Sequence, residues 1–361
     1  MAKLVLHIGA HKTGTSYLQS LFHHNREALE RDGIHYPLIG PNMAHHALAA
    51  VWLEMPDIPA KFFRPGGPEA LWQKFLADYA NKSGTVFLSA ENFSRIRPQQ
   101  VDMADLARRL AVFDSVCIVY TMRAQVEMLP SLWLQVARSR RPLNLRRYVE
   151  TALKDHLGGG IALDHARVYT QLLTGFRRDQ ITILDYGQFR ETPGGIAQVF
   201  LNLLGSTLSA DNLLPPPADE ANISPDPLAS YIAAQICPGI SPPPGLIAKV
   251  ASELHSRQLA TASKSQGSKP APTTLLSRRE YRLIARSFAR SNAKLAAWVQ
   301  PVQPGFSFTS PSPPKGLIYR EDISAQDIQR MAAKLRRPLQ HTPFWQAANR
   351  LWRSIVNKSH F

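Results

Sequence analysis

The sequence contains little cysteine, no long apolar run and, in its last third, few acidic residues. Its two cysteines, Cys117 and Cys237, are too few for a disulfide framework or a four-ligand zinc site. No apolar run reaches the roughly 18–20 residues that a membrane-spanning helix needs. The apolar run after Met1 is also too short for a signal peptide, so we expect a cytoplasmic protein.

The scarcity of acidic residues is confined to the C-terminal third. Residues 249–361 hold 19 Lys and Arg but 5 Asp and Glu, which is a formal charge of +14 out of +15 for the whole chain. Such a segment indicates an anionic partner: a polyanionic substrate, a membrane surface or nucleic acid. We expect a substrate or the inner face of a membrane rather than nucleic acid. A basic surface that only keeps the protein soluble is the alternative.

The first 205 residues alternate apolar strand patterns with helix patterns, in a chain of 361 residues that can bury a large core. The strands are expected at 3–9, 85–91, 115–123 and 179–187, with a short extended piece at 33–37. The helices are expected at 15–31, 43–54, 68–80, 99–112, 124–139, 144–156, 162–175 and 193–204. Strands that are apolar on both faces and separated by helices predict an α/β fold, with a central parallel sheet flanked by helices.

Proline-rich stretches interrupt the pattern after residue 205. Residues 262–274 have the composition of a flexible, exposed segment. Further helices are expected at 277–299, 324–337 and 343–356. We therefore expect a mostly helical, proline-rich C-terminal extension. The predicted organisation is an α/β core over 1–214, a helical completion over 215–310 and a basic helical tail over 311–361.

A glycine-rich turn joins the first expected strand to the first expected helix, in LVLHIGAHKTGTSYLQ (4–19). Gly9 and Gly14 have the spacing of a nucleotide phosphate loop, G-x-x-x-x-G-K-[ST], but Thr15 stands where the lysine would be. The lysine is Lys12, two residues before the second glycine. Backbone N–H groups at the start of the helix point at one anion. The stretch thus predicts an anion site with its cation on the loop itself.

This pattern resembles the phosphosulfate loop of sulfotransferases that use 3′-phosphoadenosine 5′-phosphosulfate (PAPS). In that family a P-K-[ST]-G-T-[ST] segment follows the first strand. This chain has HKTGTS, with His11 where proline is common. The resemblance implies a P-loop NTPase-like fold, PAPS as co-substrate and no required metal. It also implies that the co-substrate is bound by His11, Lys12, Thr13, Gly14, Thr15 and Ser16.

The same family places an arginine at the end of a later strand and a serine eight positions on, where they bind the 3′-phosphate. VCIVYTMRAQVEMLPSLW supplies Arg123 and Ser131 at that spacing. Arginine suits phosphate because it offers paired donors and stays charged. The alternative is an ordinary strand-end arginine and a helix serine. NIS (222–224) and SNAKLAAWV (291–299) resemble segments of one bacterial branch of the family.

Sulfuryl transfer to a hydroxyl benefits from a base that removes the proton. Glu91 is the favoured base because it ends an expected strand, where the family carries its catalytic histidine or glutamate and where α/β sites lie. Lys12 would neutralise charge that grows on the leaving phosphate. Alternatively, Glu91 caps the following turn or pairs with Arg95 or Arg97.

Two neighbouring histidines, His45 and His46, are rivals for the role of base, since their ordinary pKa suits proton transfer near neutral pH. On a helix, neighbouring side chains point about 100° apart, so only one of the two would face the site. His46 is kept as a candidate catalytic residue. Acceptor binding or packing is the alternative role for this pair.

These features together predict a sulfotransferase that moves a sulfuryl group from PAPS to an acceptor hydroxyl, on a carbohydrate or a lipid-linked glycan. The aromatic residues of the insert 40–80 could line an acceptor cleft or simply pack. One alternative is a nucleotide-dependent kinase, which would need a lysine after Gly14 and a strand-end aspartate for Mg²⁺. The other is a basic protein that binds membrane surfaces or nucleic acid without catalysis.

Overall fold

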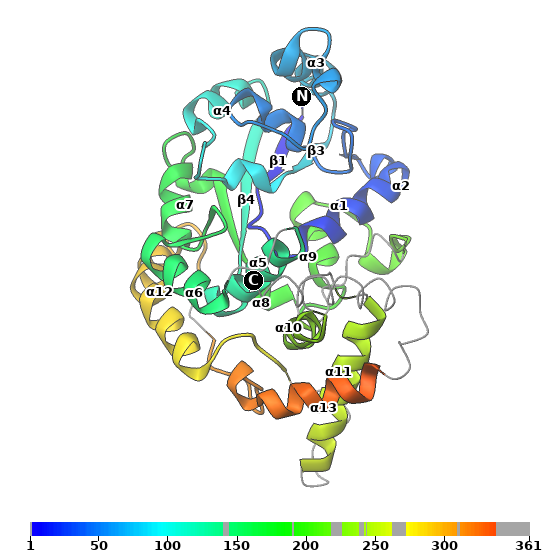
Figure 1. Cartoon of the computed structure of the whole chain (residues 1–361). Coiled ribbons are helices and arrows are strands. Elements are labelled where there is room, and N and C mark those ends of the chain that lie inside the picture. The colour runs from blue at the N-terminus through cyan, green and yellow to red at the C-terminus, as the bar shows by residue number, and fades with distance from the viewer. Residues whose placement is uncertain are drawn as a thin grey trace, which may run out of the picture. The chain divides into compact units, whose positions relative to one another are not determined.

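The structure is a computed structural model of the whole chain. It describes residues 2–139, 144–189, 191–217, 226–237, 242, 244–261, 272–308 and 311–336. The chain divides into two compact units (Figure 1). The first unit comprises residues 1–128, 154–222 and 288–310, and the second comprises residues 129–153, 223–287 and 311–361.

A parallel sheet of five strands is the centre of the first unit, with the order β2-β3-β1-β4-β7. The strands are β1 (Lys3–His7), β2 (Ile34–His35), β3 (Thr85–Ser89), β4 (Ser115–Met122) and β7 (Ile181–Asp185). Each neighbouring pair is parallel, with His7 level with Ser89 on one side and Val119 on the other. The expected α/β fold with a central parallel sheet is confirmed, and each expected strand is present with shorter bounds.

The helices of the chain follow the expected order, with added elements on both sides of residue 205, among them a short helix over 186–189. They are α1 (Thr15–His24), α2 (Arg26–Arg31), α3 (Gly67–Tyr79), α4 (Met103–Leu110), α5 (Gln125–Ser139), α6 (Leu145–Asp155), α7 (His165–Leu172), α8 (Tyr186–Phe189), α9 (Gly195–Leu204), α10 (Pro227–Ile236), α11 (Pro244–Thr261), α12 (Arg278–Val299) and α13 (Ala325–Arg336). The sequence patterns did not indicate α10 and α11, nor the hairpin of β5 (Leu157–Gly158) and β6 (Ile161–Ala162). The expected helix 343–356 lies outside the described residues.

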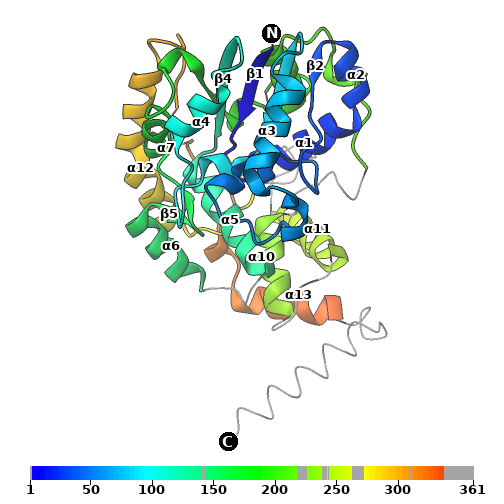
Figure 2. The same ribbon diagram turned by 90° about the horizontal axis from the view of Figure 1, so that it is seen from above.

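Both faces of the sheet are buried by helices, as the continuous apolar strands require. Val5, Phe87 and Val119 face α1, α2 and α9, where Phe22 and Phe200 pack on Phe87. The alternate strand residues point to the other face, where α4 and α7 lie (Figures 1 and 2). This alternation is the period of a strand, and it places consecutive strand residues in two separate cores.

The expected helix 15–31 is two helices, with a break at Asn25. Asn25 is buried, and its side-chain amide nitrogen donates to the carbonyls of Leu21 and Leu214, both at 2.8 Å. Its amide oxygen accepts from the backbone N–H of Leu214, also at 2.8 Å. These bonds hold a residue distant in sequence against the end of α1, and Asn25 leaves helical geometry to make them.

The prediction of an α-helix over 43–54 is wrong. In that range the structure has a 3-10 helix, η1 (His46–Val51). The carbonyl of Met43 accepts from the Tyr36 hydroxyl at 2.7 Å, and the N–H of His45 donates to the carbonyl of Ser89 at 3.0 Å. These tertiary contacts hold residues 43 and 45 in place, and the helical turn begins at His46.

The described part of the chain after residue 214 is mostly helical, as expected. Helices α10, α11 and α13 pack together. Lys334 of α13 pairs with Glu253 of α11 at 2.6 Å, and Arg320 pairs with Glu280 of α12 at 3.0 Å. Among the helices described, none combines the length and the apolar character needed to cross a membrane.

Replacement of Asn25 by alanine tests the break between α1 and α2. It removes both partners of the Leu214 backbone, so we expect the free energy of unfolding to fall by about 1–3 kcal/mol. Chemical denaturation measures this loss. Asn202→Ala, at an exposed position of α9, is the control and should change stability by less than about 0.5 kcal/mol. Equal effects of the two variants would contradict the role given to Asn25.

Candidate functional site

The loop between β1 and α1 has the backbone of an anion-binding turn. Pairing with β4 continues beyond the end of β1, since the N–H of Ile8 donates to Val119 and the carbonyl of Gly9 accepts from Thr121. Gly9, Lys12 and Gly14 then adopt positive φ angles of 80°, 67° and 80°. Left-handed residues of this kind occur in turns whose backbone N–H groups form a concavity for anions, and α1 begins directly after Gly14. The geometry of the loop therefore fits an anion.

The hydroxyl groups of the loop have different surroundings. Thr13 is buried and donates its hydroxyl to the carbonyl of Ala10 at 2.6 Å. Its oxygen also lies 3.3 Å from that of Thr15, whereas Ser16 is exposed on the first turn of α1. Thr13 thus closes the turn itself, and Thr15 and Ser16 lie in the first turn of α1, and the N-terminus of a helix favours anions.

Arg123 follows β4 and is attached to the loop. Its Nη1 donates to the carbonyl oxygen of Lys12 at 2.8 Å, and its Nε donates to Glu127 at 3.2 Å. Its guanidinium carbon lies 4.9 Å from the centre of the Tyr186 ring. The two predicted halves of the site, loop and arginine, are therefore joined by a hydrogen bond.

Buried polar side chains hold the backbone around Arg123, and sequence reasoning missed most of them. His165 Nε2 donates to the carbonyl of Arg123 at 2.9 Å, while its Nδ1 accepts from the Tyr120 hydroxyl, also at 2.9 Å. Gln125 and Asn292 exchange two amide hydrogen bonds, at 2.9 and 3.1 Å. Asn292 belongs to the stretch SNAKLAAWV, so the family pattern was the signal that could have found it.

Burial lowers the pKa of His165 to about 4, although the carbonyl of Arg123 and the charge of Asp164 act in the opposite direction. The ring is therefore neutral at ordinary pH, as its one donated and one accepted hydrogen bond require. His165 thus holds the backbone of Arg123 in place by a hydrogen bond and adds no charge to the site.

One expected binding residue, Ser131, and the family-like segment 222–224 are not placed beside the loop by the described contacts. Ser131 lies on α5, half-buried, in a part of that helix that belongs to the second compact unit. Residues 222–224, the NIS segment, lie outside the described residues. The expected 3′-phosphate contact of Ser131 stays a prediction.

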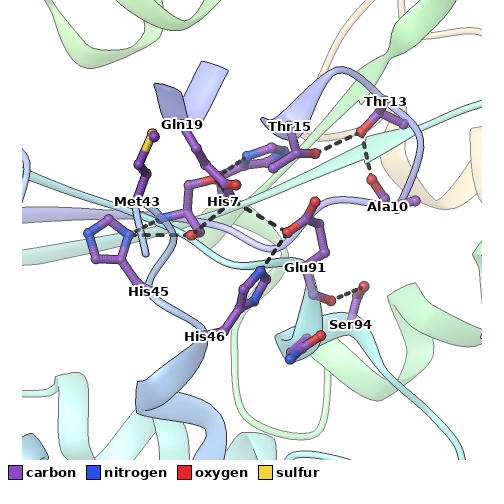
Figure 3. Close-up of polar contacts among 12 residues, drawn as sticks. His7, Ala10, Thr13, Thr15, Gln19, Met43, His45, His46, Glu91 and Ser94 are labelled. Atoms are coloured by element: carbon purple, nitrogen blue, oxygen red, sulfur yellow. Dashed lines mark hydrogen bonds and ion pairs between the residues drawn. The ribbon is translucent and has the colours of Figure 1, made fainter. Parts of the chain in front are cut away.

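Glu91 lies against the phosphate loop. It begins the 3-10 turn η3 (Glu91–Ser94) just after β3 and is 7% exposed. A Cβ at Gly9 would lie 2.8 Å from its Cγ, so only glycine lets the two chains approach this closely. Its Oε2 lies 3.3 Å from both His46 Nε2 and Gln19 Nε2 (Figure 3). Among the described contacts, Glu91 therefore binds His46 and Gln19 rather than Arg95 or Arg97.

The hydrogen-bond donors around Glu91 favour its ionised form. Burial alone would raise its pKa, but His46, His11 and the local backbone lower the pKa below its ordinary value. Burial lowers the pKa of His46 and of His11, and Glu91 only partly offsets this. We assign a carboxylate at Glu91 and neutral rings at both histidines near neutral pH. A carboxylate that keeps its proton acceptor sites is the state that a general base needs.

The two histidines of the insert point in different directions. His45 is buried, with Nδ1 accepting from the N–H of Ser89 at 2.9 Å and Nε2 donating to the carbonyl of Pro37 at 2.8 Å. Burial lowers its pKa to about 4, so this ring links two backbone segments as a neutral group. His46 instead faces Glu91 (Figure 3).

The aromatic residues of the insert mainly pack with one another. Trp72 is fully buried and donates its indole N–H to the carbonyl of Leu48 at 2.7 Å. Trp52 packs on Trp72 and donates to Asp105 at 3.0 Å. Phe62 and Phe63 pack edge to face and are half-buried. In the described part of the chain, no cluster of three or more His, Cys, Asp or Glu side chains could hold a metal ion.

A parallel β-sheet flanked by helices, with a glycine turn at its carboxyl edge and an arginine bonded to that turn, is a P-loop-like α/β fold. No family model and no curated protein matches the sequence. Among solved structures, the chain is similar to a sulfotransferase from Alicyclobacillus acidocaldarius, with 17% identity, a TM-score of 0.39 and coverage of 72% of this chain and 96% of that one.

Two further solved structures are also sulfotransferase domains, the family that the sequence motifs resemble. The domain of the curacin biosynthetic pathway has 12% identity and a TM-score of 0.36, with 70% of this chain and 98% of that chain covered. The domain of the Synechococcus PCC 7002 olefin synthase has 11% identity and a TM-score of 0.31, with 80% and 94% covered.

Replacement of Gly9 by alanine tests the close approach of the loop and Glu91. Left-handed backbone geometry costs an alanine about 1–2 kcal/mol, and the contact with Glu91 should add at least about 1 kcal/mol. Gly205→Ala is the matched control, since Gly205 has a φ of 76° and no atom within 4 Å of its added Cβ. Chemical denaturation should show the larger loss for Gly9→Ala. Equal losses would mean that the loop can move away from Glu91.

Proposed function

We propose that this protein is a PAPS-dependent sulfotransferase. The observation that carries the proposal is the hydrogen bond from Arg123 to the carbonyl of Lys12, at 2.8 Å. It brings an arginine, which suits a phosphate, to the turn whose backbone suits a second anionic group. A co-substrate with two separate phosphate-type groups, as PAPS has, fits this pair of sites.

The side chains around the loop supply roles for each step of the transfer. The acceptor oxygen forms a bond to sulfur while the bond from sulfur to the bridging oxygen breaks, which leaves 3′,5′-adenosine bisphosphate. Lys12 and the N–H groups at the start of α1 stabilise the charge that grows on the leaving phosphate. Glu91, buried beside the loop, takes the proton of the acceptor hydroxyl.

We propose a carbohydrate or lipid-linked hydroxyl as the acceptor, on the family resemblance and on the half-buried aromatic residues Phe62 and Phe63 of the insert. An acceptor screen with labelled PAPS would identify it.

A basic contact to an anionic surface is proposed for the C-terminal third. Arg279, Arg282 and Arg286 are exposed along one side of α12, and such a row favours anions.

Replacement of Arg123 by alanine tests the co-substrate. Loss of charge-assisted hydrogen bonds, worth about 1.5–3 kcal/mol, should weaken the binding of 3′,5′-adenosine bisphosphate about 10- to 150-fold. Isothermal titration calorimetry measures this effect. Arg177→Ala, which removes an exposed arginine paired with Asp179, is the control and should bind as the wild type does. Tighter binding of ATP with Mg²⁺ than of the bisphosphate would reject the proposal and favour a kinase.

Replacement of Glu91 by glutamine tests the base. The amide keeps the size of the side chain but cannot take a proton, so the bisphosphate should bind normally while turnover falls about 100- to 10,000-fold. Calorimetry and a sulfation assay with labelled PAPS measure the two quantities. A large loss of bisphosphate binding would instead show that Glu91 shapes the loop.

A further inference from the structure

The side chain of Gln19 connects the end of β3 to the carboxylate of Glu91. Gln19 lies on the second turn of α1 and is 6% exposed. Its Nε2 lies 3.2 Å from Ser89 Oγ, 3.3 Å from the carbonyl oxygen of Ser89 and 3.3 Å from Glu91 Oε2. A carbonyl and a carboxylate can only accept hydrogen bonds. The amide nitrogen of Gln19, and not its amide oxygen, therefore faces the Ser89 carbonyl and the Glu91 carboxylate.

Ser89 is itself held by a buried ring. Its hydroxyl lies 3.1 Å from Nδ1 of His7, and Nε2 of His7 lies 3.2 Å from the Thr121 hydroxyl. Burial lowers the pKa of His7 to about 4, so this ring is a neutral link between β3 and β4. The position of Gln19 is therefore set by the sheet.

His46 reaches the same oxygen of Glu91 from the other direction. Its Nε2 lies 3.3 Å from Glu91 Oε2 and must donate, since the carboxylate only accepts. The lone pair of the neutral ring is then on Nδ1, which is buried and has no hydrogen-bond partner among the described residues. A histidine whose lone pair is buried in this way cannot take the proton of an acceptor hydroxyl in this geometry.

We propose that Gln19 and His46 are positioning residues that hold Oε2 of Glu91 from two sides, so that Oε1 is the oxygen that receives the proton of the acceptor. The proposal rests on the proposed sulfotransferase function. Figure 3 shows the second carboxylate oxygen directed to the side where Thr13 and Thr15 of the loop lie. The oxygen that remains for proton transfer thus faces the phosphate loop. In this arrangement His46 is a hydrogen-bond donor to Glu91 and not the base.

Two donors on one carboxylate stabilise its charged form, so they also set its pKa. The titratable and charged groups that act on the Glu91 carboxylate or on its partner His46 are His7, His11, Tyr36, His45, His46 and Arg95. Gln19 is uncharged, so its removal changes the hydrogen bonding of Glu91 without changing the net charge of the site. That makes Gln19 the cleaner position for a test.

The first experiment measures the pKa of Glu91 without any substrate. Infrared difference titration, with a Glu91→Gln partner in each background, isolates the carboxyl band of this residue. Gln19→Leu should raise the pKa by about one unit, because a donor to the charged form is lost. Gln73→Leu is the matched control: Gln73 donates to a carboxylate too, that of Glu69 at 3.2 Å, but on the exposed surface of α3. An unchanged pKa in Gln19→Leu would overturn the proposal.

The second experiment separates a donor from a base at His46. His46→Gln keeps an N–H donor but cannot accept a proton, whereas His46→Leu keeps neither. If His46 positions Glu91, turnover should fall within about threefold for His46→Gln and at least about tenfold for His46→Leu. In the dependence of kcat on pH, the acid limb should also move to higher pH in Gln19→Leu and His46→Leu, because each variant removes a donor to the Glu91 carboxylate. A His46→Gln variant as inactive as Glu91→Gln would make His46 the base and overturn the proposal.

The two experiments also distinguish this proposal from the proposed function. If the wild type neither binds the bisphosphate nor sulfates any acceptor, the sulfotransferase function fails, yet the titration still decides whether Gln19 holds the carboxylate. If sulfation proceeds and the pKa of Glu91 does not respond to Gln19→Leu, the function stands and the positioning role is rejected. Circular dichroism of each variant checks that the fold is retained.

Discussion

The hydrogen bond between Arg123 and the carbonyl of Lys12 is the contact on which the candidate site depends. Lys12 has a φ of 67°, a left-handed conformation that costs a non-glycine residue about 1–3 kcal/mol. A hydrogen bond to a charged group contributes about 1.5–3 kcal/mol and can offset this cost. Because β1 and β4 are adjacent and parallel, both residues emerge at the same edge of the sheet. One bond thereby fixes the shape of the loop and the place of the arginine.

Burial of a carboxylate beside this loop imposes the second constraint. An ionised group removed from water needs hydrogen-bond partners, and Glu91 receives them from α1 and from η1. The absence of a side chain at Gly9 lets the carboxylate approach the turn. The loop and the carboxylate are thus shaped together, since the glycine that permits the turn also leaves room for the group beside it.

The fold could be predicted from sequence where local pattern and tertiary packing agree. Continuous apolar strands separated by helices predicted the parallel sheet, because each strand is covered on both faces. The helix break at Asn25 could not be predicted in this way. Its cause is a pair of hydrogen bonds to Leu214, which lies 189 positions further along the chain. The same holds for His45, whose backbone N–H and ring both bind Ser89, which lies 44 positions further along the chain.

The sequence by itself determined which chemical groups stand at the strand ends: Lys12 on a glycine turn, Glu91 after β3 and Arg123 after β4. The ends of parallel, paired strands are neighbours, so the site could be expected from the sequence alone. Only the tertiary structure decided which of two adjacent histidines faces Glu91. It also decided that Gln19 shares the same carboxylate oxygen. These choices depend on the direction of side chains in a packed core, where hydrogen-bond partners come from segments far apart in sequence.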